Sequence, residues 1–190
     1  MTKIQSSEGV ADSLSKLDLT ESDDLLIIAL DFGTTYSGIA YIFNTLGKPE
    51  PTTITNWPAA GGRNDPKIPT LLEYDKSDKT KFVWGKEVNR SSSDKIEGVK
   101  LLLDPTQQVP LFVPAQSMKA ALQKLGKLPV EVASDYIGAM YKHALQVIED
   151  ELPPGYMDMY QKKFVLSVPA VWSDKAKDLT LKASERKCDS

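Results

Sequence analysis

The strongest pattern along the chain is a long apolar stretch near residue 25, interrupted once by a polar turn. Residues 25–30 are uncharged leucines, isoleucines and alanine, as expected of a strand that is buried on both faces. After five residues, 31–35, that include a glycine and two threonines, residues 36–43 resume with aromatic and branched side chains. Two such runs joined by so short a connection predict a β-hairpin.

Shorter patterns follow the hairpin. They predict, in order, a strand at 51–57, a loop at 58–69, strands at 70–74 and 81–84, and a helical turn at 85–90. Residues 95–103 are compatible with either a strand or a helix. Asp104 and Pro105 end this segment, because the residue before a proline is disfavoured in helical geometry.

The second half of the chain is predicted to be mainly helical. Apolar residues recur at three- and four-residue spacings over residues 129–152, which defines one apolar stripe. A shorter amphipathic helix is predicted at 115–125. A buried strand at 162–168 is followed by a final helix, which has Ser173 as its N-cap and Asp174 in its first turn and continues over 175–187.

The composition is that of an ordinary globular chain: 190 residues, 41% apolar, 26% charged and a formal net charge of −3. Without a Lys/Arg-rich run, nucleic acid is not expected as a partner. Residues 1–24 are polar, lack an apolar core of signal-peptide length, and are predicted to form a disordered or loosely attached tail. The longest apolar run, 25–30, is too short to cross a bilayer, so no membrane partner is expected.

The polar turn of the hairpin is the main candidate for chemistry. Successive backbone N–H groups in such a turn form a concave nest that suits a phosphate, and Gly33 has no Cβ to keep a ligand away. Thr34 and Thr35 add hydroxyl donors. Asp31 has the wrong charge for a phosphate and the right one for a hydrated Mg²⁺ beside it. The alternative is a polar turn that only closes two strands.

The single histidine and the single cysteine show no comparable pattern. His143 falls on or near the apolar stripe and has no Cys, Asp or second His at ligand spacing, which favours a packed or capping histidine over a metal ligand. Cys188 cannot form an intrachain disulfide, which fits a reducing compartment. We therefore expect the cytoplasm.

Two strings resemble a known family. DFGTTYSGIAY, which begins at Asp31, resembles the first phosphate-binding motif of the actin-like ATPase superfamily, and its Thr-Thr-Tyr-Ser favours the seventy-kilodalton heat-shock chaperones. FVLSVPAVWSDKAKDLT, which begins at Phe164, resembles the family segment in which a strand ending in Val-Pro-Ala leads into a helix. The element order between them is that of a ribonuclease-H-like core. The resemblance implies an α/β fold, a mixed sheet with flanking helices, in which residues 25–190 form the first lobe of a divergent heat-shock-like ATPase domain.

The resemblance also implies a site for ATP or ADP with Mg²⁺. Gly33, Thr34, Thr35 and Tyr36 would hold the phosphates, and Asp31 would bind the metal through water. The family places a catalytic lysine in a stretch similar to Val-Lys-Leu-Leu-Leu, and the matching residue here is Lys100. The sequence departs from the pattern after it, because Leu101 stands where arginine is usual and Asp104-Pro105 where glycine is expected. The competing interpretation is an ordinary surface lysine.

Several interpretations of function remain open. The later phosphate and adenosine motifs of the family do not occur in the 190 residues, so the chain resembles a truncated domain whose intact form would hydrolyse ATP and would engage a protein client or co-chaperone. Alone, we expect it to be inactive. The first alternative is a non-catalytic half-domain or scaffold that binds nucleotide weakly or not at all. The second is a sugar or metabolite kinase of the same fold.

Overall fold

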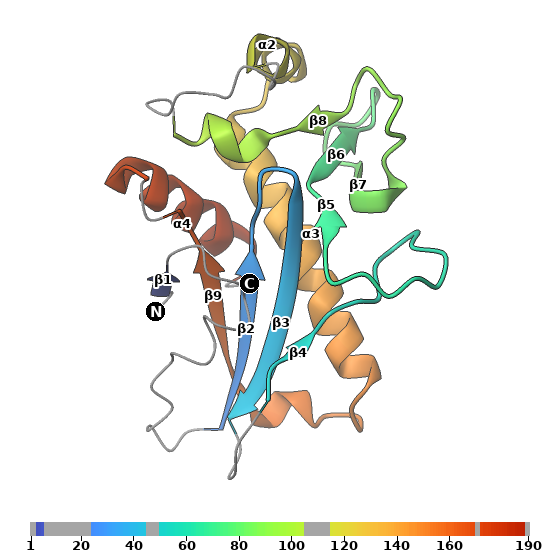
Figure 1. The fold of residues 1–190 in the computed structure, drawn as a ribbon, viewed down its shortest axis with the longest axis vertical. Helices are drawn as coiled ribbons and strands as arrows, with labels where there is room; N and C mark the ends of the chain where they lie inside the picture. The colour runs from blue at the N-terminus through green and yellow to red at the C-terminus, as the bar shows by residue number, and fades with distance from the viewer. Residues whose placement is uncertain (1–2, 6–23, 45–49, 105–114, 170–171, 189–190) are drawn as a thin grey trace.

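The computed structural model describes residues 3–5, 24–44, 50–104, 115–169 and 172–188. These residues form an α/β fold in which a mixed sheet is flanked by helices (Figure 1). The strands of the main sheet follow the order β1-β9-β2-β3-β4, and β5 pairs with the beginning of β3.

The predicted hairpin is confirmed and forms the centre of this sheet. Strands β2 (Leu25–Asp31) and β3 (Tyr36–Asn44) are antiparallel, with Ile28 in register with Tyr41. Strand β9 (Gln161–Ser167), predicted at 162–168, lies parallel to β2 on its other side. The polar turn therefore follows the C-terminal end of β2, beside the C-terminal end of β9.

Both faces of β2 are buried, as its uninterrupted apolar run predicts. Successive side chains of a strand point to opposite faces, and here they join two separate clusters. The larger contains Leu26, Ile28 and Leu30, and the smaller contains Leu25, Ile27 and Ala29. Because neither face is free to turn toward water, the register of β2, and hence the position of the turn, is strongly specified.

Helices cover one face of the sheet. Helix α3 (Pro129–Asp150) runs across it with α4 (Asp174–Cys188) alongside, and residues of both join the larger cluster (Figure 1). Both helices occur where the sequence predicts them. A short 3₁₀ turn, η3 (Met157–Met159), connects α3 to β9, and α2 (Ala115–Leu125) precedes α3.

A second, smaller sheet stands beside the hairpin turn. Its strands are β6 (Leu71–Tyr74), β7 (Phe82–Trp84) and β8 (Ile96–Glu97), in the order β7-β6-β8. The helical turn predicted at 85–90 is shorter, the 3₁₀ turn η1 (Gly85–Glu87). The strands predicted at 70–74 and 81–84 are confirmed.

The strand predicted at 51–57 is largely wrong. Only β4 (Thr52–Thr53) pairs with β3, and the predicted loop that follows contains β5 (Ile68–Pro69). The chain folds back on itself here, since the Trp57 indole N–H donates to the Asp65 carbonyl at 2.8 Å. A local contact of this kind competes with strand pairing, and the pattern of apolar residues does not predict it.

Only a small part of the predicted N-terminal tail is described by the structure. Residues Lys3–Gln5 form β1, which pairs in parallel with β9; three residues are too few for a periodic pattern to predict a strand. Residues 1–2 and 6–23 of the tail lie outside the described part of the chain. Within the described part, no helix is both long and apolar enough to cross a bilayer.

Candidate functional site

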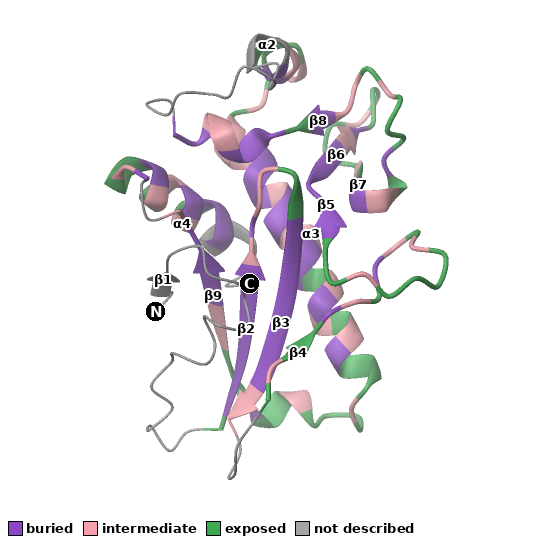
Figure 2. Cartoon of the chain, viewed as in Figure 1, coloured by how far each residue is buried: buried purple, intermediate pink, exposed green. Residues whose placement is uncertain are grey.

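The turn between β2 and β3 is closed tightly around Gly33. In Figure 2 the two strands are purple and the turn changes to pink and green, so the burial ends there. A Cβ at Gly33 would lie 1.9 Å from the carbonyl oxygen of Tyr36, which no other residue can tolerate without moving the backbone. The close approach that requires glycine is therefore that of the chain to itself, and not that of a ligand.

Two buried hydroxyl groups hold this turn from inside. The Gly33 N–H donates to Ser37 Oγ at 3.2 Å, Ser37 Oγ lies 2.8 Å from Thr70 Oγ1, and Thr70 Oγ1 donates to the Gly33 carbonyl at 3.0 Å. Because Thr70 has one proton and donates it to Gly33, Ser37 must donate to Thr70. The result is a closed ring of three hydrogen bonds, with every group satisfied.

Lys100 reaches the same turn from a distant part of the chain. The ambiguous segment 95–103 forms β8 and then the 3₁₀ turn η2 (Val99–Leu102), with Gly98 between them at φ +67°. This left-handed position, which glycine adopts readily, directs the chain so that Lys100 is buried, with 7% of its surface exposed. The surface-lysine interpretation is therefore wrong, whereas the catalytic role of Lys100 stays a prediction.

The Lys100 ammonium sits among backbone and aromatic groups. It donates to the carbonyl oxygen of Phe32, inside the turn, and lies 5.8 Å from the centre of the Phe32 ring. Trp172, which precedes α4, contributes a second ring at 5.3 Å. Cation–π contacts of this length are favourable when water is excluded, so the rings compensate in part for lost hydration.

Burial lowers the pKa of Lys100 from 10.5 to about 8. Desolvation is the largest cause, because it penalises the charged form. The negative charge of Asp31 acts in the opposite direction, and the positive charge of Lys67 lowers the pKa further. Near neutral pH the ammonium is mostly protonated. At a pH near its pKa, an anion beside it would raise the pKa and increase the protonated fraction.

Asp31, the last residue of β2, is held by two partners. Ser167 Oγ donates to Asp31 Oδ1 at 2.9 Å, and Lys67 Nζ lies 2.6 Å from Oδ2. The Asp31 side chain remains 20% exposed, whereas that of Lys67 is 50% exposed. Ser167 comes from the end of β9, so the parallel pairing of β2 and β9 brings these two groups together.

The role of Asp31 in holding a hydrated Mg²⁺ stays a prediction from the sequence. Mg²⁺ keeps several waters and commonly takes only one or two carboxylates in addition to substrate phosphates. Among the described residues no group of three or more His, Cys, Asp or Glu could hold a metal by itself, so a protein-only metal centre is not supported there. Lys67 already occupies one oxygen of Asp31, and a hydrated ion at that oxygen would have to replace it.

The outer rim of the turn is accessible. Thr34 is partly exposed, Thr35 is exposed, and the Tyr36 side chain is 45% exposed. Within the described ranges, the hydroxyls of Thr34 and Thr35 make no hydrogen bond to the protein, although the Thr35 carbonyl accepts one from the Thr70 N–H at 2.8 Å. The three side chains are therefore accessible to a ligand, and their phosphate-binding role stays a prediction; the Gly33 N–H is already bonded to Ser37.

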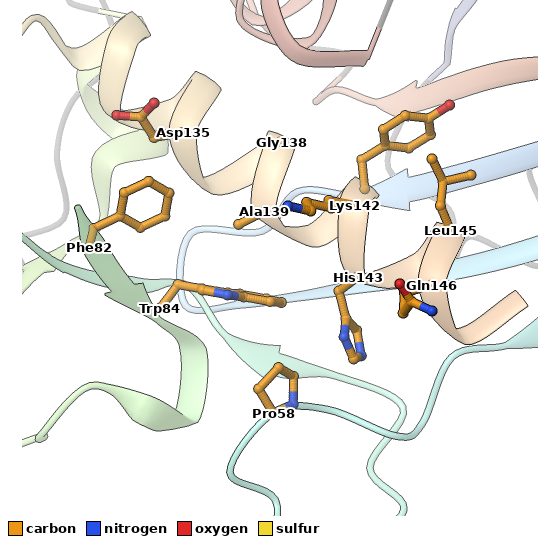
Figure 3. Close-up of a pocket in the computed structure, with 11 residues that line it drawn as sticks. Pro58, Phe82, Trp84, Asp135, Gly138, Ala139, Lys142, His143, Leu145 and Gln146 are labelled. Atoms are coloured by element: carbon orange, nitrogen blue, oxygen red, sulfur yellow. The ribbon is translucent and has the colours of Figure 1, made fainter. Parts of the chain in front are cut away.

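Two hollows occur in the described part of the chain, and one of them borders the turn. One, of about 500 Å³, is lined by Tyr36 and Lys67 together with residues of the loop between β4 and β5 and of η1. The other, of about 620 Å³, lies between β7 and α3 and shares no lining residue with the turn. Figure 3 shows the rings of Phe82 and Trp84 and the side chain of His143 around it.

His143 is a packed residue, as predicted. Its ring stacks on Trp57 at 5.5 Å between centres, and its Nε2 lies 2.6 Å from the Asn56 carbonyl. These contacts connect α3 with the segment after β4, and His143 does not contact the turn residues of the candidate site.

Four residues of the site are absent from the sequence prediction: Ser37, Lys67, Thr70 and Ser167. Ser37 and Thr70 are polar positions inside strand-like stretches, and a polar residue at a buried strand position could have indicated a buried network. Lys67 lies in a loop and Ser167 at a strand end. No local sequence pattern indicates that both contact Asp31.

Comparisons with known proteins do not assign the chain. No family model matches it, and no curated protein matches it in sequence.

Proposed function

We propose that the chain forms one wall of an ATP·Mg²⁺ site of the heat-shock-70-like kind, on a ribonuclease-H-like fold. The observation that carries the proposal is the meeting of three segments that the resemblance selects independently. Asp31 and the turn come from the first motif, Lys100 from the middle segment, and Ser167 and Trp172 from the last. Ser167 contacts Asp31, and Lys100 contacts the turn and lies over Trp172.

Each residue has a role that follows from its surroundings. Thr34, Thr35 and Tyr36 lie at the accessible rim and would donate to phosphate oxygens. Lys100 would place a positive charge behind the turn, where it would stabilise charge that develops on a transferred phosphoryl group. Asp31 would orient the water shell of the metal.

The bound nucleotide would supply the phosphoryl group, and Mg²⁺ would neutralise part of its charge. The protein contributes positioning and electrostatics, and the ring formed by Gly33, Ser37 and Thr70 keeps the turn in one shape. A preformed site of this kind loses less entropy when ligand binds. A protein client or co-chaperone and a cytoplasmic location stay predictions from the resemblance and from the single cysteine.

A second candidate is a scaffold that binds nucleotide weakly or not at all. One observation favours it: the Gly33 N–H, a donor of the predicted nest, is already bonded to Ser37. A phosphate at the turn would therefore meet fewer free backbone donors than a fully open nest provides.

Calorimetric titration of MgATP into the chain separates these candidates. We expect saturable binding that weakens by roughly tenfold in the variant Thr34→Val/Thr35→Val, which loses two hydroxyl donors. The matched control is Thr53→Val, since Thr53 is an exposed strand residue away from the turn. No binding by the wild-type chain would favour the scaffold, and equal binding by all variants would show that the turn is not the site.

A further inference from the structure

Half of the residues that line the hollow beside Tyr36 are charged. Four of them are cationic, and one is a carboxylate: Arg63, Lys67, Lys86, Arg90 and Asp65. They come from the loop between β4 and β5, from η1 and from the segment after it. Segments that are separate in sequence thus direct like charges into one space of about 500 Å³, which is large enough for a small ligand.

Close ion pairs among the described residues engage only two of the four cations. Lys86 makes an ion pair with Asp65, and Lys67 pairs with Asp31 at 2.6 Å. In the described part of the chain, neither Arg63 nor Arg90 makes an ion pair or a side-chain hydrogen bond. Both are exposed at the hollow, so their guanidinium groups are available to a ligand.

The loop that carries Arg63 and Asp65 is preformed. The Arg63 N–H donates to the Ala60 carbonyl at 3.3 Å, and the Asp65 N–H donates to the Thr55 carbonyl at 3.1 Å. Ala59, which also lines the hollow, has a φ of +55°. A non-glycine residue in this left-handed region is uncommon and strained, and such strain is concentrated at functional sites.

The negative charge of Asp65 is already satisfied. Its pKa is held below the usual value by its hydrogen bond to Lys86 and by the charge of Lys86, with a smaller contribution from Arg63. Asp65 is therefore ionised at neutral pH and paired with Lys86. Its single negative charge does not neutralise the positive charges of both arginines.

From this arrangement we infer that the hollow is a second anion site, which takes a phosphoryl group of a small ligand on Arg63 and Arg90. Guanidinium groups match phosphate and carboxylate oxygens with pairs of parallel hydrogen bonds. A phosphoryl group is favoured over a carboxylate because it brings up to two charges and three terminal oxygens to a hollow that four cationic residues line. The inference does not depend on ATP binding at Thr34 and Thr35.

Calorimetry with sodium pyrophosphate at low ionic strength tests the inference on the whole chain. We expect binding to weaken by at least about tenfold in Arg63→Gln/Arg90→Gln, which removes two charge-assisted contacts. The control Lys119→Gln/Lys175→Gln changes the net charge equally at exposed positions outside the hollow, and it should bind as the wild type does.

Two further arms separate this site from the turn and identify the ligand class. Thr34→Val/Thr35→Val should bind pyrophosphate as the wild type does, even if it loses MgATP. Malonate, a dicarboxylate of similar size, should bind more weakly than pyrophosphate. Absence of pyrophosphate binding, an equal loss in the lysine control, a loss in the threonine variant alone, or equal binding of malonate would overturn the inference. Arg63→Lys/Arg90→Lys keeps the charge and should lose less than the glutamine variant, which guards against a folding defect.

Discussion

Removing the buried charge of Lys100 should change how stability depends on pH. The ammonium is surrounded by Phe32 and Trp172, and its pKa in the folded protein is about 8, against 10.5 ordinarily. Between these values the unfolded chain binds more protons than the folded one, so the free energy of unfolding rises with pH. The charged lysine thus costs stability at neutral pH, and the cost is relieved as the folded protein releases the proton.

The size of the effect follows from the two pKa values. The whole difference corresponds to roughly 3 kcal/mol against the charged form. Between pH 7 and pH 9.5 the free energy of unfolding should therefore rise by about 2 kcal/mol because of Lys100 alone. Below pH 7 the contribution is nearly constant, because the lysine is protonated in both states.

The assay is denaturant unfolding of the wild type and of Lys100→Met at several pH values. Methionine keeps an unbranched apolar side chain and removes the titrating group, although it leaves the Phe32 carbonyl without its donor. The loss of this hydrogen bond does not depend on pH, and the tyrosines titrate in both proteins. The difference between the two curves of unfolding free energy against pH therefore reports the titration of Lys100. We expect the stability of the variant, relative to the wild type, to fall by about 2 kcal/mol from pH 7 to pH 9.5. Parallel curves would refute the reasoning, since they would mean that Lys100 is hydrated.

Three further substitutions probe the turn itself. Gly33→Ala should destabilise the protein by more than about 2 kcal/mol in thermal unfolding, because its Cβ meets the Tyr36 carbonyl at 1.9 Å. Ser37→Ala should cost roughly 1–3 kcal/mol by the same measurement, because it leaves the Gly33 N–H unsatisfied. Asp31→Asn should lower the pKa of Lys100 further, seen as an earlier onset of the pH-dependent rise in stability, because the carboxylate is the charge that raises it.

Matched controls sharpen these outcomes. Gly62→Ala introduces a Cβ with no atom within 4 Å, so it should cost only the roughly 1 kcal/mol of a positive φ. Ser93→Ala, at an exposed position, should be near neutral. If the turn variants cost no more than these controls, the turn is looser than its contacts indicate. An unchanged onset in Asp31→Asn would mean that the carboxylate does not act on Lys100.

The hairpin and the long helix could be predicted from the sequence because each depends on a strong local pattern. Residues 25–30 are apolar without a break, and residues 129–152 repeat with helical spacing, so burial alone selects the structure. β4 and β1 could not be predicted in this way. The former is cut short by the contact of Trp57 with Asp65, and the latter exists only because β9 offers an edge to three residues.

The candidate site was predictable to the extent that a motif marked it. Asp31 and the threonines follow from the turn, and Lys100 from the resemblance. The partners that fix their properties are remote in sequence: Ser167 is 136 residues from Asp31, and Phe32 is 68 residues from Lys100. Such contacts depend on strand register and on the course of η2, which local composition does not encode.

The number of protons taken up when MgATP is added tests most directly whether phosphates bind at the turn beside the buried Lys100. At pH 8 about half of the Lys100 side chains are neutral, and a polyphosphate beside them would raise the pKa of the ammonium. Calorimetric titration of MgATP in buffers of different ionisation enthalpy measures the protons taken up. We predict roughly half a proton per nucleotide for the wild type and none for Lys100→Met. Binding without proton uptake in the wild type, or equal uptake in both proteins, would contradict the placement of the phosphates against Lys100.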